Sequence, residues 1–266
     1  MRKSLLMVGT LLAVGSATAG AQESTTWNWS GDLGAGRTVF LRNVNGFVRI
    51  EAGTSDKVEV TAVKSWRRGD PDDVRIEARM AGSGRGDIIL CALWGERATC
   101  DESGYRSNNG GRDSDGWRRG NDVKVEFVVK VPTNAKVDAS TVNGDLRVDG
   151  THGDIRASTV NGDLEAFSVA GRVEASTVNG SITVRNGGSV TEDTEYTTVN
   201  GSITVEIPSN TNATVNLSTV NGRISSDFPL TLHGDINPRR IRADIGTGGA
   251  RIRARTVNGS VRLRKP

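Results

Sequence analysis

The chain has 266 residues, which is enough for one large domain or two small ones. Aromatic residues make up only 5% of it, whereas glycine contributes 33 residues. With recurring threonine and valine, this composition favours short strands and tight turns over helices, and the mature chain shows neither a helical period nor a coiled-coil heptad.

The first residues have the pattern of a secretory signal peptide. Arg2 and Lys3 precede a short apolar stretch over residues 4–18, and the small residues Ala19-Gly20-Ala21 follow it. The alternative is a membrane anchor, but the apolar stretch falls short of the ~20 residues that span a bilayer. We therefore expect residues 1–21 to be a signal peptide, and the mature chain to be exported to the periplasm or cell surface without a transmembrane segment.

The charge of the mature chain is close to zero but unevenly distributed. Without residues 1–21 the chain has 32 Lys and Arg against 31 Asp and Glu, so its charge does not indicate a nucleic-acid partner. Residues 138–206 contain eleven acidic and four basic residues, and residues 239–265 contain nine basic residues and one acidic residue. The sequence therefore predicts an acidic middle and a basic end.

Residues 22–137 are predicted to form an irregular, β-rich cap. The expected strands are longer than those that follow and cover residues 39–41, 48–51, 58–63, 74–78, 88–93 and 123–131. They would form either a small β-sandwich or the first irregular coils of a solenoid. In both cases they would cover strand edges that otherwise invite aggregation.

Two cysteines lie within this cap. In an exported chain, Cys91 and Cys100 predict a disulfide, because their eight-residue separation does not match the short spacing of a metal knuckle. A Gly-, Asn-, Ser- and Arg-rich loop over residues 102–122 is expected to be mobile. Trp117 beside two arginines could contact a sugar or an anionic polymer, or simply fold back onto the protein.

The C-terminal half is dominated by a repeat. Thr-Val-Asn-Gly begins at Thr141 and recurs after 18, 18, 21, 21 and 37 residues. A polar and then an apolar residue follow each glycine, as in Asp145-Leu146. The expected turn ladder consists of Asn143, Gly144, Asn161, Gly162, Asn179, Gly180, Asn200, Gly201, Asn221, Gly222, Asn258 and Gly259.

This period predicts that residues 138–266 form a repetitive, single-chain β-solenoid. A short strand cannot bury its apolar face alone, so successive units would stack and hydrogen-bond about 4.8 Å apart, with asparagine side chains bonding along the axis. A meander of hairpins is the alternative, since Asn-Gly is also a hairpin signal. We expect one buried column opposite Ile155 and Val173, formed by Val142, Val160, Val178, Val199, Val220 and Val257.

The sequence contains little that indicates catalysis. Neither a nucleophile elbow, nor a zinc-binding helix, nor a phosphate loop is present. His152 and His233 occupy turn positions of the repeat. Asp145, Asp154 and Asp163 share the half-period of calcium rolls but lack their paired glycines. We expect no metal, no cofactor and no enzyme; a glycan-active β-helix enzyme is the alternative.

Several segments together resemble a known family. These are the signal peptide, the strands at residues 88–91 and 127–132, the Thr-Val-Asn-Gly repeats, and the C-terminal segments at residues 225–230 and 256–263. They resemble the bacterial β-strand-repeat putative adhesins, a domain family of unknown function. The resemblance covers nearly all of the mature chain and implies a repetitive β-fold with no catalytic residues to transfer.

The basic C-terminal end is the candidate binding surface. Arginines alternate with apolar residues there, which places each set on one outer face of a strand. We expect a non-catalytic binding or scaffold protein of the bacterial envelope whose partner is unknown, with an anionic glycan or glycolipid as the hypothesis. The alternative is a solvated face that protects a terminal edge. The candidate residues are Arg251, Arg253, Arg255, Arg262 and Arg264.

Overall fold

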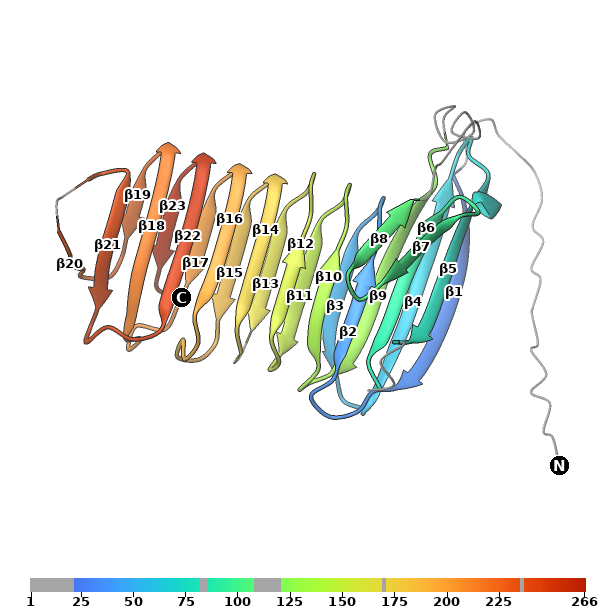
Figure 1. Cartoon of the computed structure of the whole chain (residues 1–266), viewed down its shortest axis with the longest axis horizontal. Coiled ribbons are helices and arrows are strands. Elements are labelled where there is room, and N and C mark those ends of the chain that lie inside the picture. The colour runs from blue at the N-terminus through green and yellow to red at the C-terminus, as the bar shows by residue number, and fades with distance from the viewer. Residues whose placement is uncertain (1–21, 82–85, 108–120, 169–170, 235–236) are drawn as a thin grey trace.

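The computed structural model describes residues 22–81, 86–107, 121–168, 171–234 and 237–266. The expected signal peptide and the Trp117 segment lie outside these residues. The described chain is a β-solenoid in which two large sheets face each other, and its strands lie side by side along one long axis (Figure 1). Apart from strands it contains a single 3-10 turn, η1 at Pro71–Asp73.

The first sheet, sheet A, has ten strands. Its strands, in spatial order, are β1 (Glu23–Asp32), β4 (Lys57–Trp66), β9 (Lys124–Pro132), β3 (Val48–Gly53), β11 (Leu146–Thr151), β13 (Leu164–Ser168), β15 (Ile182–Asn186), β17 (Ile203–Glu206), β23 (Val261–Arg264) and β19 (Ile224–Ser226).

The second sheet, sheet B, has eleven strands. Its strands, in spatial order, are β20 (Thr231–Leu232), β21 (Arg240–Ile245), β18 (Ala213–Asn221), β22 (Arg251–Asn258), β16 (Thr194–Asn200), β14 (Val173–Asn179), β12 (Ile155–Ser158), β10 (Lys136–Ser140), β2 (Thr38–Arg42), β6 (Ile88–Trp94) and β5 (Val74–Met80). A hairpin of β7 (Ala98–Asp101) and β8 (Gly104–Ser107) is separate from both sheets.

Each regular coil contributes one strand to each sheet. Neighbouring coils pair in parallel at offsets of 18 or 21 residues, as in Ile155 with Val173 on sheet B and Leu146 with Leu164 on sheet A. Because the strands pair in register, residues at one repeat position lie next to each other in successive coils. The residues of one repeat position therefore form continuous rows across the strands.

The last two strands of the chain are inserted into the stack. β22 and β23 lie between the coil of β16 and β17 and the coil of β18 and β19, and they pair in parallel with both (Figure 1). β21 then pairs antiparallel with the outer edge of β18. This order explains the 37-residue interval before Thr256, because the chain forms the outer coil and β21 before it returns.

The N-terminal part combines stacked and antiparallel strands. β2 and β3 already pair in parallel with β10 and β11, and the expected division at residues 137 and 138 falls inside β10. Beyond them, β1 pairs antiparallel with β4, β4 with β9, and β5 with β6. Part of the loop that was expected to be mobile forms β8.

The predicted column of repeat valines is wrong. Val178 is 40% exposed, and the other five repeat valines are also exposed. On β14, alternation begins with buried Val173 and continues through Ala175 to Thr177, so the next residue points outward. The repeat threonines take the inward place, and the Thr177 hydroxyl donates to the Gly162 carbonyl at 3.1 Å.

The predicted burial of the other strand residues is confirmed. Leu146 and Val148 on sheet A face Ile155 and Val173 on sheet B, and all four are at most 1% exposed. One hydrophobic cluster runs through the coils and into the N-terminal part. With the inward positions filled, the outward rows remain for contact with other molecules.

Candidate functional site on the outer face of sheet B

The turns contain a ladder of asparagine side chains. The Asn161 amide nitrogen donates to the Asn143 side-chain oxygen at 2.8 Å, and the Asn179 amide donates to Asn161 at the same distance. Three further bonds continue the ladder through Asn200, Asn258 and Asn221. The side-chain amides of neighbouring coils therefore hydrogen-bond to one another along the solenoid axis, and the ladder has a structural role in the described chain.

The residue after each turn glycine forms a second ladder. The Asp145 carboxylate accepts the Asp163 backbone N–H at 2.8 Å, and Asp163 accepts the Ser181 backbone N–H at 2.7 Å. Where serine replaces aspartate, the Ser181 hydroxyl accepts the Ser202 backbone N–H at 3.3 Å. Both residue types suit this position because each offers a short acceptor to the next coil. Among the described residues, no group of three potential ligands could hold a metal ion.

The disulfide fixes the hairpin over the outer face of sheet B. Cys91 points outward from β6 and is bonded to Cys100 on β7. The two sulfurs belong to a small cluster with Ile89 and Leu93, separate from the main core. The hairpin also covers Arg42, which is 4% exposed and whose guanidinium donates to the Glu102 carbonyl at 2.7 Å. The hairpin of β7 and β8 therefore covers one end of the outer face of sheet B.

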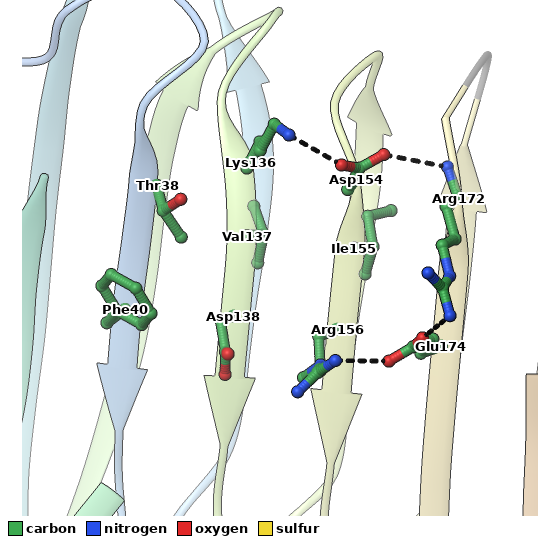
Figure 2. A pocket seen from close by; sticks show the side chains of 10 residues that line it. All are labelled: Thr38, Phe40, Lys136, Val137, Asp138, Asp154, Ile155, Arg156, Arg172 and Glu174. Carbon is green, nitrogen blue, oxygen red and sulfur yellow. Dashed lines mark hydrogen bonds and ion pairs between the residues drawn. The ribbon is translucent and has the colours of Figure 1, made fainter. Parts of the chain in front are cut away.

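A groove with a volume of about 230 Å³ lies on sheet B next to this closed end. Figure 2 shows its charged side chains on β10, β12 and β14, with Phe40 from β2 at one side. Lys136 contacts Asp154 at 2.9 Å, and Arg156 contacts Glu174 at 2.8 Å. Arg172 also pairs with Glu174, so the groove is lined by compensated charges.

The contact between Lys136 and Asp154 changes the pKa of both residues. The hydrogen bond from the Lys136 ammonium lowers the pKa of Asp154, and the same contact raises the pKa of Lys136. Both groups are therefore charged at neutral pH, which suits an ion pair and not the donor or acceptor of a catalytic proton. Sequence reasoning missed this groove. The sequence signal for the groove was that Lys136, Asp154 and Arg172 occupy the same position in successive 18-residue units.

The candidate arginines lie on two different sheets. Arg251, Arg253 and Arg255 point outward from β22 on sheet B. Arg262 and Arg264 point outward from β23 on sheet A. The structure therefore does not bring the five together into one patch, because consecutive strands of a coil belong to opposite sheets.

Two arginines from another strand join the sheet B group. Arg240 and Arg242 extend outward from β21, and the strand between β21 and β22 is β18. In register, Asn216 of β18 lies between Arg242 and Arg253. Ser218 lies between Arg240 and Arg255 in the same way. The resulting sheet B arginine group consists of Arg240, Arg242, Arg251, Arg253 and Arg255.

His152 lies between the coil strands β11 and β12, whereas His233 follows β20 and its backbone N–H donates to the Arg242 carbonyl at 2.8 Å. The His152 backbone N–H donates to the Thr133 carbonyl at 2.7 Å. His233 lies 2.7 Å from the Asp244 carboxylate, which also accepts from Thr214. The Thr214 hydrogen bond, with a contribution from His233, lowers the pKa of Asp244. Neither histidine lies in the groove.

Comparison with known families agrees with this architecture. Residues 119–264, more than half of the chain, match the family described as Toastrack DUF4097. The chain belongs to the Toastrack DUF4097 family. The matched residues of this Toastrack protein include every strand from β9 to β23. No curated protein matches the chain.

Solved structures with a similar course of the chain are distant. A putative cell adhesion protein from Clostridium sporogenes ATCC 15579 is 10% identical, with a TM-score of 0.44, and the match covers 92% of this chain and 100% of that chain. A putative adhesin from Bacteroides fragilis NCTC 9343 is 10% identical, with a TM-score of 0.34 and coverage of 91% and 97%. A putative lipid binding protein from Parabacteroides distasonis ATCC 8503 is 10% identical, with a TM-score of 0.29 and coverage of 93% and 97%.

In the part of the Toastrack protein that the structure describes, no helix has the length and apolar character needed to cross a membrane.

Proposed function

We propose that this protein is an exported, non-catalytic binding protein of the bacterial envelope. We propose further that the sheet B arginine group holds anionic envelope material, such as a phosphorylated glycolipid or an acidic glycan. The observation that carries the proposal is the placement of arginines on both sides of the neutral strand β18.

The geometry of this group suits an extended anion. β21 and β22 are two strand steps apart, which is roughly 10 Å. Asn216 and Ser218 lie between them and, within the described chain, their side chains make no hydrogen bond. A phosphate or carboxylate above β18 would therefore meet guanidinium groups on both sides and polar donors below. Guanidinium groups bind such anions in bidentate fashion.

Most of these arginines are available for a ligand. Arg253 contacts Glu195 at 3.4 Å, but no described carboxylate forms an ion pair with Arg240, Arg242 or Arg255. By contrast, the acidic residues along the groove face arginine or lysine partners. This difference supports anion binding at the C-terminal end of sheet B rather than along its middle.

The ion pairs of the groove support a non-catalytic role. An enzyme that cleaves glycans requires a pair of carboxyl groups on either side of the scissile bond, one of them able to transfer a proton. Asp138, Asp154 and Glu174 instead contact Arg42, Lys136 and Arg156 respectively. The Lys136 contact lowers the pKa of Asp154, which does not suit a general acid.

Sedimentation with isolated envelope tests the proposal. The test variant carries Arg240→Gln, Arg242→Gln, Arg253→Gln and Arg255→Gln. The matched control carries Arg262→Gln and Arg264→Gln on the opposite sheet. We expect the parent and the control to sediment with envelope and the test variant to remain in solution.

Salt dependence completes this test. Binding through exposed arginines should weaken as salt rises, because the screening length falls to about 8 Å near physiological ionic strength. Folding of each variant is checked by circular dichroism. Binding that persists in the folded test variant, or that does not change with salt, would contradict the proposal.

A further inference from the structure

A second groove, with a volume of about 410 Å³, runs over β12, β14 and β16 on the outer face of sheet B. It is lined by Ser158, Ser176 and Thr197, which occupy the same repeat position in successive coils, and by charged residues of the adjoining row. Ser140 extends the serine row onto β10. The four hydroxyl side chains thus form a row of about 14 Å along the solenoid axis. We refer to this feature as the hydroxyl trench.

The hydroxyls of the trench have no partner in the described structure. None of Ser140, Ser158, Ser176 and Thr197 uses its side chain in a hydrogen bond. One position further along, each repeat threonine donates to a glycine carbonyl of a neighbouring coil, and the turn asparagines bond to one another. Neighbouring coils therefore provide hydrogen-bond partners for the threonines and asparagines beside this row, whereas the side-chain hydroxyls of the row have no such partner within the described residues.

The two sides of the trench differ in polarity. On one side the row of Glu174 and Glu195 includes Arg156 and Arg253, so that positive and negative charges balance. The other side is the row of exposed repeat valines, because residues two apart on a strand share a face. These exposed valines are nearly uniform, from 38% to 40% exposed at five of the six positions.

The trench is bounded at both ends. Arg255 occupies its row on β22, next to Thr197. Arg42 occupies the row on β2, next to Ser140, and lies beneath the hairpin that the disulfide holds. A ligand that fills the trench would therefore lie along the solenoid axis between these two arginines.

We infer that the hydroxyl trench is a binding site for an uncharged oligosaccharide chain. A sugar ring presents an apolar face of C–H groups and an edge of hydroxyls. The valine row matches the apolar face, while the free hydroxyls and the balanced charged row offer hydrogen-bond donors and acceptors to the edge. The balance of charge along the row gives a charged polymer no advantage. The trench adjoins the sheet B arginine group at Arg253 and Arg255 but extends away from it toward β10, and it binds a different ligand.

Isothermal titration with neutral hexasaccharides tests this inference. The probes are cellohexaose, maltohexaose, laminarihexaose and hexa-N-acetylchitohexaose, titrated into the mature protein at low and high salt. We expect at least one probe to bind with a Kd in the millimolar range or below, equally well at both salt concentrations, because no net charge drives the contact.

Two arginine substitutions locate the site. Ser176→Arg fills the trench with a side chain that the fold already accepts in this row at Arg255, and it should weaken binding at least tenfold. Thr183→Arg places the same side chain on the outer face of sheet A and should leave binding unchanged. Circular dichroism and thermal melting confirm that both variants fold.

Several outcomes would overturn the inference. These are the absence of heat with all four probes, equal binding by the Ser176→Arg variant, or binding that disappears at high salt. A variant with only Arg240→Gln and Arg242→Gln removes the β21 arginines of the sheet B arginine group, keeps Arg253 and Arg255 beside the trench, and should bind the hexasaccharide like the parent. Failure of one proposal is thereby distinguished from failure of the other.

Discussion

The coils and the N-terminal cap differ in how closely their backbones approach at the turns. At Gly180 and Gly201, an added Cβ would lie 1.9 Å from the carbonyl oxygen of the corresponding glycine in a neighbouring coil. At Gly95 and Gly104 in the cap, nothing lies within 4 Å of such a Cβ. The coils therefore depend on backbone stacking at a fixed spacing, whereas the cap turns at Gly95 and Gly104 leave room for a side chain. This comparison predicts that equivalent substitutions will have unequal effects in the two regions.

The largest effect should come from a charge placed inside a coil. Val184→Asp buries an unpaired carboxylate at a fully buried position, and we expect it to lower the free energy of unfolding by about 3–5 kcal/mol. Val178→Asp, at an exposed position of the same repeat, should change it by about 0.5 kcal/mol or less. Urea unfolding measures both. Equal losses would contradict the assignment of the repeat valines to the outer face.

A methyl group at the turns compares the two regions directly. Gly180→Ala forces a Cβ into a neighbouring backbone, and we expect a loss of several kcal/mol, because the obstructing atoms belong to another coil. Gly95→Ala meets open space but has a φ of +88°, so strain of about 1–2 kcal/mol is expected. Thermal melting of both variants tests this order, and a larger loss for Gly95→Ala would reverse the comparison.

Removal of the disulfide should affect the cap and not the coils. A cross-link that closes so short a loop contributes about 2–3 kcal/mol, so the Cys91→Ala/Cys100→Ala variant should be less stable by that amount. Hydrogen exchange should increase in β7 and β8 and stay unchanged in β12 to β16. Faster exchange throughout the coils would show that the coils depend on the disulfide hairpin more than its separate hydrophobic cluster indicates.

Alkaline pH should weaken the coils through one buried phenol. Burial raises the pKa of Tyr196 from 10.0 to about 12. The stability due to the neutral phenol is therefore complete below pH 10 and is lost as pH rises toward 12, by on the order of 2 kcal/mol. Tyr196→Phe should remove this part of the pH dependence. A parent and a variant with the same profile between pH 10 and 12 would contradict it.

The repeat allowed the coils to be predicted further than the cap. Equal spacing of Thr-Val-Asn-Gly indicated stacking and placed the turn asparagines together. Spacing did not reveal which side of the strand Val178 faces, because a shift of one residue exchanges the two faces. Thr177 takes the buried position because its hydroxyl donates to a carbonyl of another coil, and the sequence does not reveal this contact. The periodic pattern alone favoured burial of Val178, which is the more apolar of the two residues.

The order of the last coils was also beyond the sequence pattern. Every coil carries the same turn, so the turn sequence does not determine where the coil of β22 and β23 lies in the stack. This coil lies next to β16, and β22 therefore separates β16 from β18, the next strand of sheet B along the chain. The sequence predicted that Arg240 and Arg242 lie near Arg253 and Arg255, but not that the neutral strand β18 lies between them.

We propose that the coils, and not the cap, present the binding surface. Arginine modification with phenylglyoxal, followed by mass spectrometry, tests this on the mature protein with and without isolated envelope. We expect protection of Arg240, Arg242 and Arg255, with Arg262 and Arg264 on the opposite sheet and Arg75 in the cap modified equally in both samples. Protection of Arg75, or of Arg262 and Arg264 in place of the sheet B arginine group, would contradict it.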